Sequence, residues 1–139
     1  MKNKRISLRE GVRFHGHLGP YLILGIRAGE WALKRLRCKK YFGINVKVWG
    51  AHKKPKSCLV DGLQLSTGAT FGKGNIAKCN GSKIRMEFTD ILKRKRVCLE
   101  LREDLVKRLT RAKTHRDCES LAKGLYRTKT AGLFLTINE

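Results

Sequence analysis

The chain has 139 residues, of which 41% are hydrophobic, and 32 lysines and arginines against 11 acidic residues give it a formal net charge of +21. This length predicts one domain with its own core and leaves little room for a second. The charge favours polyanions as partners, namely nucleic acid, acidic cofactors or anionic membranes, but it does not determine the fold. A charged surface that only keeps the protein in solution is the alternative.

Five cysteines occur singly, with no Cys-x-x-Cys pair, at positions 38, 58, 79, 98 and 118. Zinc ribbons and redox dithiols use such pairs, so the spacing predicts free thiols in a reducing compartment. The basic first residues lead into no apolar stretch of signal-peptide length. No run approaches the roughly 20 apolar residues that cross a bilayer. We therefore expect a cytoplasmic protein without a membrane span.

The first half of the chain predicts helix, strand and helix in turn. Apolar residues at helical spacing behind Gly19-Pro20 indicate a helix at about 20–37. β-branched and aromatic residues favour a strand over 41–50. A second helix is expected at 57–66, with Gly68 as its stop.

The second half predicts more strands and two amphipathic helices. Residues 76–79 and 83–88 flank Asn80-Gly81, the dipeptide typical of a two-residue type I′ hairpin. Further elements are expected as a strand at 96–101, helices at about 102–112 and 115–126, and a last strand at 133–137. Helices mixed with an antiparallel hairpin predict an α+β fold, in which a single domain over residues 1–139 packs its helices on a mainly antiparallel sheet.

Two histidines and one cysteine are the candidate metal ligands. Imidazole nitrogen and thiolate sulfur are donors that zinc and related metals prefer, and His15, His17 and Cys58 offer both kinds. In a helix the two histidines would point about 160° apart, whereas an extended turn would let them converge. Three protein ligands would leave a position open for water or substrate. The alternative is that His15 and His17 cap a helix and Cys58 is a small core residue.

The predicted helix at 57–66 has one polar stripe, formed by Cys58, Asp61 and Gln64, opposite its leucines. It contains no lysine or arginine, which in so basic a chain indicates a buried helix. Asp61 could orient a ligating histidine or act as a general base, and Gln64 could bond a substrate. An ordinary exposed helix face is the alternative.

A glycine-rich segment, Thr67-Gly-Ala-Thr-Phe-Gly-Lys-Gly-Asn75, follows that helix. It lacks the spacing of a phosphate-binding P-loop, and Gly74 stands where Ser or Thr would hold magnesium. Its glycines still indicate unusual backbone dihedrals, with amide groups and Lys73 available to an anion. A plain tight turn explains the glycines equally well.

Basic clusters are spread along the whole chain, at residues 34–40, 53–56, 93–96 and 107–111. Nucleic-acid modules need a basic face, and those that bind single strands also need exposed aromatics. Aromatic residues make up only 7% of the chain, and no such module's signature is present. Nucleic-acid binding is therefore a secondary hypothesis beside a solvated surface.

Two motifs resemble the FmdE family of formylmethanofuran dehydrogenase. They are Phe14-His-Gly-His-Leu-Gly-Pro20, and Cys58-Leu-Val-Asp-Gly-Leu-Gln64 running into the segment that ends at Asn75. The resemblance covers about residues 10–90, followed by a basic, helical region at about 91–139.

This resemblance implies an α+β core domain, commonly a homodimer, in an archaeal protein. It implies a metal pocket, with zinc as the expected cofactor, held by the residues that match His15, His17 and Cys58. Asp61 would be the base or orienter in this pocket. The expected contacts to a small anionic substrate or coenzyme are Gln64, Thr67, Thr70, Lys73 and Asn75.

The chain departs from the family pattern at two places. Gly19 stands where many members have a cysteine, so two-thiol chemistry is not implied. The carboxyl-terminal region lacks the paired cysteines of the zinc ribbon that many members append. A nucleic-acid-binding protein on the same scaffold, or an accessory subunit of a larger enzyme, are the alternative functions.

Overall fold

The structure, a computed structural model, describes residues 4–137, within which no helix is long and apolar enough to cross a bilayer. Five strands form one sheet of order β2-β1-β3-β4-β5. They are β1 (Ile44–Trp49), β2 (Ile76–Cys79), β3 (Arg85–Asp90), β4 (Lys95–Leu101) and β5 (Phe134–Ile137). β2 runs parallel to β1, and all other neighbours are antiparallel. The α+β fold with a mainly antiparallel sheet is therefore confirmed.

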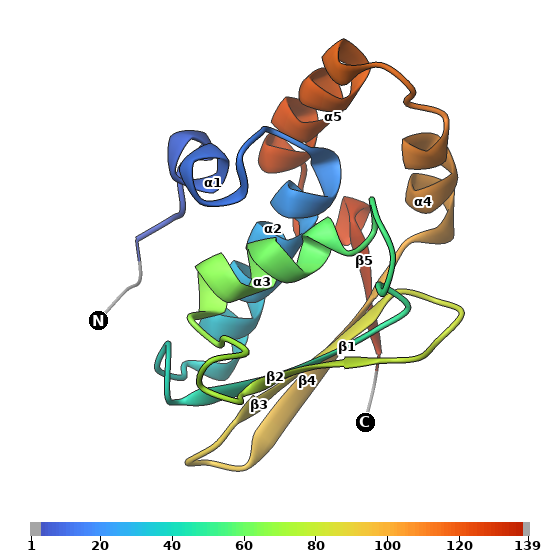
Figure 1. The fold of residues 1–139 in the computed structure, drawn as a ribbon. Coiled ribbons are helices and arrows are strands. Elements are labelled where there is room, and N and C mark those ends of the chain that lie inside the picture. The colour runs from blue at the N-terminus through green and yellow to red at the C-terminus, as the bar shows by residue number, and fades with distance from the viewer. Residues whose placement is uncertain (1–3, 138–139) are drawn as a thin grey trace.

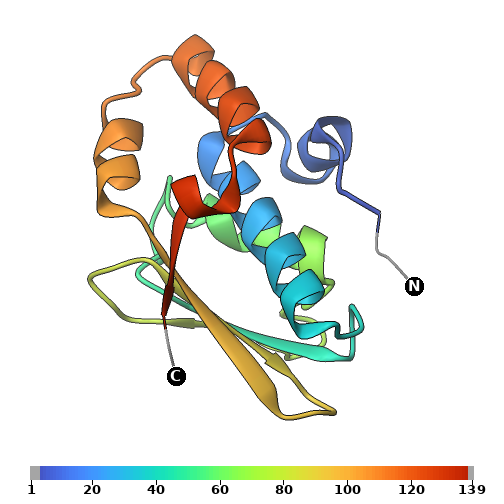
Figure 2. The same ribbon diagram turned by 180° about the vertical axis from the view of Figure 1, so that it is seen from behind.

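The helices gather on one side of the sheet (Figure 1) and leave its other side uncovered, as the view from behind also shows (Figure 2). They are α1 (Leu8–His15), α2 (Pro20–Leu36), α3 (Cys58–Thr67), α4 (Glu103–Thr110) and α5 (His115–Arg127), followed by the 3₁₀ turn η1 (Thr130–Gly132). Alternate strand residues, among them Val46, Met86 and Leu99, face the helices and are almost fully buried. Apolar burial between the two layers supplies the main stabilisation.

Helices α2 and α3 cross so closely that glycine is required on both. A Cβ atom added at Gly25 would overlap the carbonyl oxygen of Leu59, and one added at Gly62 would overlap that of Leu22. The Ser66 hydroxyl donates a hydrogen bond of 3.2 Å to the Gly25 carbonyl across the same contact. This contact fixes the position of α3, and with it the predicted polar stripe.

The predicted hairpin between residues 76–79 and 83–88 is wrong. β2 and β3 are not neighbours, because β1 lies between them. Helix α3 carries the chain from β1 back to β2 in the same direction, the long connection that parallel strands need. Asn80-Gly81 instead turns the chain beside the end of β1, where a Cβ at Gly81 would lie 3.0 Å from that of Trp49.

Helix α1 has no counterpart among the predicted elements, although its start has a sequence signature. The Ser7 hydroxyl accepts from the Glu10 backbone N–H at 3.1 Å, and the Glu10 carboxylate accepts from the Ser7 N–H at 3.0 Å. This reciprocal pair is a capping box, read in sequence as Ser-x-x-Glu. The capped helix ends at His15.

Residues beyond 90 belong to the same two layers as the rest. β4 and β5 extend the sheet, and α5 packs against α2. The Arg27 guanidinium on α2 donates a hydrogen bond of 2.7 Å to the Leu125 carbonyl near the end of α5. The Lys93 ammonium donates to the Leu36 carbonyl at 2.9 Å, at the carboxyl end of α2. The basic region therefore supports the central helix directly.

Gly62→Ala should destabilise the protein by about 1–3 kcal/mol or more, because its new methyl group meets backbone that cannot move aside. Gly124→Ala is the matched control: it lies inside α5 with no atom within 4 Å of the added Cβ, so alanine should stabilise the helix by about 0.5–1 kcal/mol. Chemical denaturation of both variants measures the difference. Equal stability of the two variants would contradict the close crossing.

Candidate metal centre

The first two candidate ligands meet through a left-handed turn. α1 ends at His15, and Gly16 adopts φ 110°, with its N–H donating to the Val12 carbonyl at 2.7 Å. This conformation favours glycine, and it reverses the chain before His17. The rings of His15 and His17 have centroids 4.9 Å apart and are nearly perpendicular. The turn therefore brings together two side chains that a continued helix would separate.

Asp61 joins this cluster from α3. The ring Nδ1 of His15 lies 2.6 Å from Asp61 Oδ2. A carboxylate oxygen only accepts, so Nδ1–H is the donor and Nε2 stays free to bind a metal. The His15 side chain is 11% exposed and that of Asp61 is 39% exposed. The carboxylate thus holds a mostly buried imidazole in one orientation while remaining accessible from solvent.

Cys58 is the first residue of α3, one turn before Asp61, and is partly buried. Burial raises the pKa of its thiol, and the negative charge of Asp61 raises it further, while Lys54 acts in the opposite direction. The free protein therefore holds Cys58 as a neutral thiol at neutral pH. A metal would have to displace that proton to bind the sulfur.

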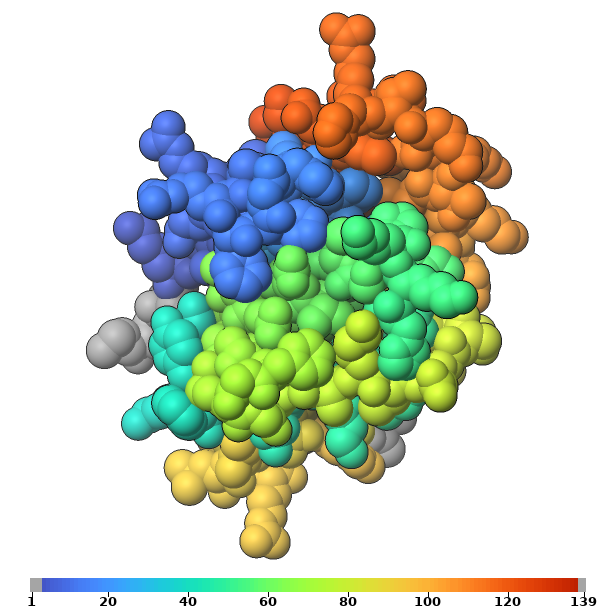
Figure 3. Space-filling model, in the orientation of Figure 1, coloured from blue at the N-terminus to red at the C-terminus, as the bar shows by residue number. Residues whose placement is uncertain are grey.

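A third histidine, absent from the predicted ligand set, lies beside His17. His115 is the first residue of α5, behind the N-cap Thr114, and its ring centroid is 5.6 Å from that of His17. Three of the chain's four histidines therefore belong to one cluster, in which His15 and His115 each contact the ring of His17. Figure 3 shows the amino-terminal segment in blue beside both α3 in green and the carboxyl-terminal helical region in orange.

Gly19, the position of the family cysteine, also borders the cluster. A Cβ atom at Gly19 would lie 3.1 Å from Cε1 and 3.4 Å from Nδ1 of His17. A side chain at this position would press on the imidazole, so glycine gives the His17 ring its room. The departure from the family pattern therefore lies inside the candidate site.

Gln64 and Thr67 secure the carboxyl end of α3. The Gln64 side-chain oxygen accepts from the Phe71 N–H at 3.2 Å. Thr67 is fully buried; its hydroxyl donates to the Leu63 carbonyl at 2.6 Å and accepts from the Ala69 N–H at 3.1 Å. With a rise of about 1.5 Å per residue, Gln64 lies about 9 Å and Thr67 about 14 Å along the axis from Cys58. Both side chains bond the backbone of α3 and the loop rather than a histidine.

The rest of the glycine-rich segment is held by its own side chains. Asn75 accepts from the Thr70 N–H at 2.9 Å and donates to the carbonyls of Tyr41 and Ile44 at 2.6 and 3.0 Å. The Lys73 ammonium donates to the Thr70 hydroxyl at 3.1 Å. Asn75 thereby joins the loop to the start of β1. Thr70, Lys73 and Asn75 therefore hold the turn and the start of β1 together, and their contact with a substrate stays a prediction.

The donor types and ring separations in this cluster suit zinc, but the side chains are not oriented toward a common point. Two imidazoles on one tetrahedral zinc, with Zn–N bonds of about 2.1 Å, have ring centroids about 5 Å apart. The two ring separations of 4.9 and 5.6 Å are close to that value. Within residues 4–137, however, no three His, Cys, Asp or Glu side chains converge on one point. Side-chain rotation would be needed to complete a coordination shell.

Comparison with known proteins gives two matches. The family model described as "FmdE, Molybdenum formylmethanofuran dehydrogenase operon" matches residues 14–132. A "Probable S-adenosyl-L-methionine-binding protein" of Archaeoglobus fulgidus is 33% identical over 76 residues, which are 54% of this chain and 20% of that protein. The chain thus matches about a fifth of that relative's length.

The family match extends past the 10–90 segment on which the resemblance rested and takes in β4, α4, α5 and η1. It also spans every residue of the candidate site, from His15 to His115. Because the match covers most of the chain, this protein belongs to the FmdE family of formylmethanofuran dehydrogenase.

Proposed function

We propose that this chain binds one divalent late first-row metal, with zinc the expected ion, through His15, His17 and Cys58. The observation that carries the proposal is the 2.6 Å hydrogen bond between His15 and Asp61. A carboxylate on one ring nitrogen fixes the tautomer and direction of a metal-binding imidazole. Membership of a metal-associated enzyme family supports the proposal.

His115 is the fourth donor that we include in the site. Its imidazole approaches His17 from α5, at a separation that two ligands of one metal would have. With four protein donors the coordination would be closed, whereas with three it would leave a position for substrate or water. Whether His115 binds the metal therefore decides between a closed structural site and an open catalytic site.

The chain's own residues would have distinct tasks at such a site. Asp61 orients His15 through Oδ2, and because its side chain is partly exposed, we assign it the task of taking a proton from water or substrate. Lys54 supplies positive charge near Cys58, which favours the thiolate and would attract a small anionic ligand. A bound zinc would supply Lewis-acid polarisation or activation of water.

Removing a proposed ligand should remove the metal. Purified protein is expected to hold about one zinc per chain, and Cys58→Ala and His17→Ala should each lose it, because one donor fewer weakens a site of three or four ligands. Metal analysis by mass spectrometry measures the stoichiometry. Cys79→Ala, at the end of the edge strand β2, is the control that should keep the metal. Full zinc in both ligand variants would overturn the site.

Asp61→Ala should leave the metal ligands in place but lower the zinc affinity by about 10–100-fold, because it removes the hydrogen bond that orients His15. Competition with a chromophoric zinc chelator measures the affinity. Gln64→Ala is a matched control on the same stripe, because its amide bonds the loop backbone rather than a histidine. Unchanged affinity in the Asp61 variant would remove the orienting role.

His115→Ala should lower zinc affinity at least about tenfold if the fourth imidazole binds the metal. His52→Ala, which changes the one histidine outside the cluster, serves as the control. Cobalt substitution adds a second reading, because loss of a protein ligand alters the visible spectrum of a tetrahedral cobalt site. An identical spectrum and affinity would restrict the site to three protein ligands.

A further inference from the structure

Polar and charged side chains also lie together on the uncovered face of the sheet, on the side opposite the histidine cluster. All the helices lie on the other side (Figures 1 and 2). Strand alternation places Asn45 and Lys47 of β1 and Thr89 of β3 on this outer face, while their neighbours are buried among the helices. A polar outer face is usual for an antiparallel sheet, so exposure alone indicates no ligand.

The charges on this face are unbalanced. Its acidic groups are already engaged: Glu87 pairs with Arg96 at 3.3 Å, and Glu100 pairs with Arg85 at 2.8 Å. Among the described residues, Lys47 and Arg94 have no carboxylate within ion-pair distance. Among residues 4–137, the face therefore keeps the positive charges of Lys47 and Arg94 after its ion pairs are counted.

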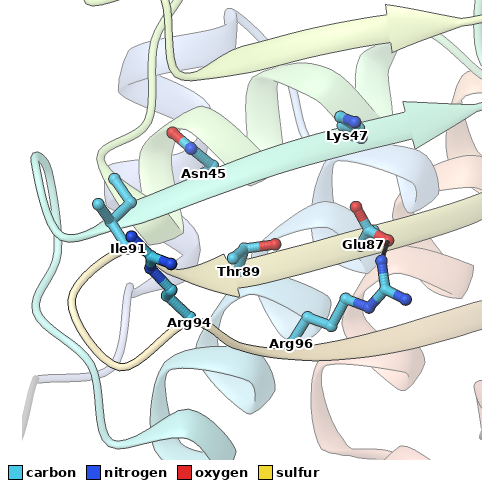
Figure 4. Close-up of a pocket in the computed structure, with 7 residues that line it drawn as sticks. All are labelled: Asn45, Lys47, Glu87, Thr89, Ile91, Arg94 and Arg96. Carbon is cyan, nitrogen blue, oxygen red and sulfur yellow. Dashed lines mark hydrogen bonds and ion pairs between the residues drawn. The ribbon is translucent and has the colours of Figure 1, made fainter. Parts of the chain in front are cut away.

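A hollow of about 510 Å³ lies on this surface and is lined by Asn45, Lys47, Glu87, Thr89, Ile91, Arg94 and Arg96. Figure 4 shows these side chains along three adjacent strands and the turn that follows β3, with Arg96 directed at Glu87. Ammonium, guanidinium, amide and hydroxyl groups supply the hydrogen-bond donors that phosphate oxygens accept. Neighbouring strands are about 4.8 Å apart, so the donors extend over about 10 Å.

We propose that this outer face binds the sugar–phosphate backbone of a single-stranded nucleic acid. Surplus cations on an open surface suit a chain of phosphates better than one enclosed anion. Trp49 lies on the same face, two residues beyond Lys47 on β1, and is partly buried. The net positive charge of this face would repel the same face of a second copy, which disfavours a homodimer through it.

The proposal is independent of the metal site, which lies on the helical side. The test uses the full chain and a fluorescein-labelled 20-nucleotide oligouridine, with binding followed by anisotropy between 50 and 300 mM salt. We compare the wild type with the double variant Lys47→Glu/Arg94→Glu. The matched control, Lys107→Glu/Arg108→Glu, reverses two exposed charges on α4 and changes the net charge equally.

The sheet-face variant should bind at least about tenfold more weakly, and its log–log salt slope should fall by about 1.4, since each lost phosphate contact on a single strand removes about 0.7. The α4 control should change affinity less than about threefold. Thermal melting and zinc content should be unchanged in both variants. Lys47→Gln/Arg94→Gln repeats the test without added negative charge if the first variant fails to fold.

Four results would overturn the proposal. The first two are no oligouridine binding at low salt and equal weakening by both charge-reversal pairs. The third is a sheet-face variant that loses binding to phosphatidylserine vesicles but keeps binding to oligouridine. The fourth is a change of oligomeric state by sedimentation in that variant with oligouridine binding retained, which would assign the face to a second copy. A negative result in the zinc experiments leaves this test unaffected, because Lys47 and Arg94 lie on the side of the sheet opposite the histidines.

Discussion

The glycine contact between α2 and α3 is the constraint on which the rest of this structure depends. Gly25 and Gly62 bring two helical backbones to a separation that any side chain would prevent. Because α2 is buried along most of its length, it fixes α3 relative to the sheet and to the amino-terminal segment. The polar residues at the start of α3 are thereby held at the surface while its leucines fill the core.

The candidate site uses three separate devices to gather its donors. The left-handed Gly16 turn places two imidazoles side by side, the α2–α3 contact presents Asp61 to His15, and the packing of α5 delivers His115. None of these devices alone makes a metal site. Together they place His15 and His115 each in ring contact with His17, while Asp61 bonds His15 and raises the pKa of the partly buried Cys58 thiol.

Local signals in the sequence predicted most elements, whereas long-range neighbours were beyond them. The Gly19-Pro20 start and the Gly68 stop define α2 and α3 to within about one residue, because both are backbone effects of single residues. Strand order depends on contacts between residues far apart in the sequence. The dipeptide Asn80-Gly81 therefore predicted a hairpin that does not form, because β1 lies between β2 and β3. The stripe on α3 was predictable from periodicity, but the arrival of His115 was not.

The site residues divide in the same way. His15, His17 and Asp61 could be selected by chemical type, and the structure brings them together. Thr67 and Asn75 were selected from the same motif, yet their hydrogen bonds hold the loop in place. The motif therefore includes residues whose side chains hold the backbone in place, and the three-dimensional contacts identify them.

X-ray absorption spectroscopy of the zinc-loaded protein would identify the atoms that bind the metal. We expect one sulfur at about 2.3 Å together with two or three imidazole nitrogens at about 2.0–2.1 Å. A shell with no sulfur, or with imidazole scattering absent, would contradict a site built from His15, His17 and Cys58.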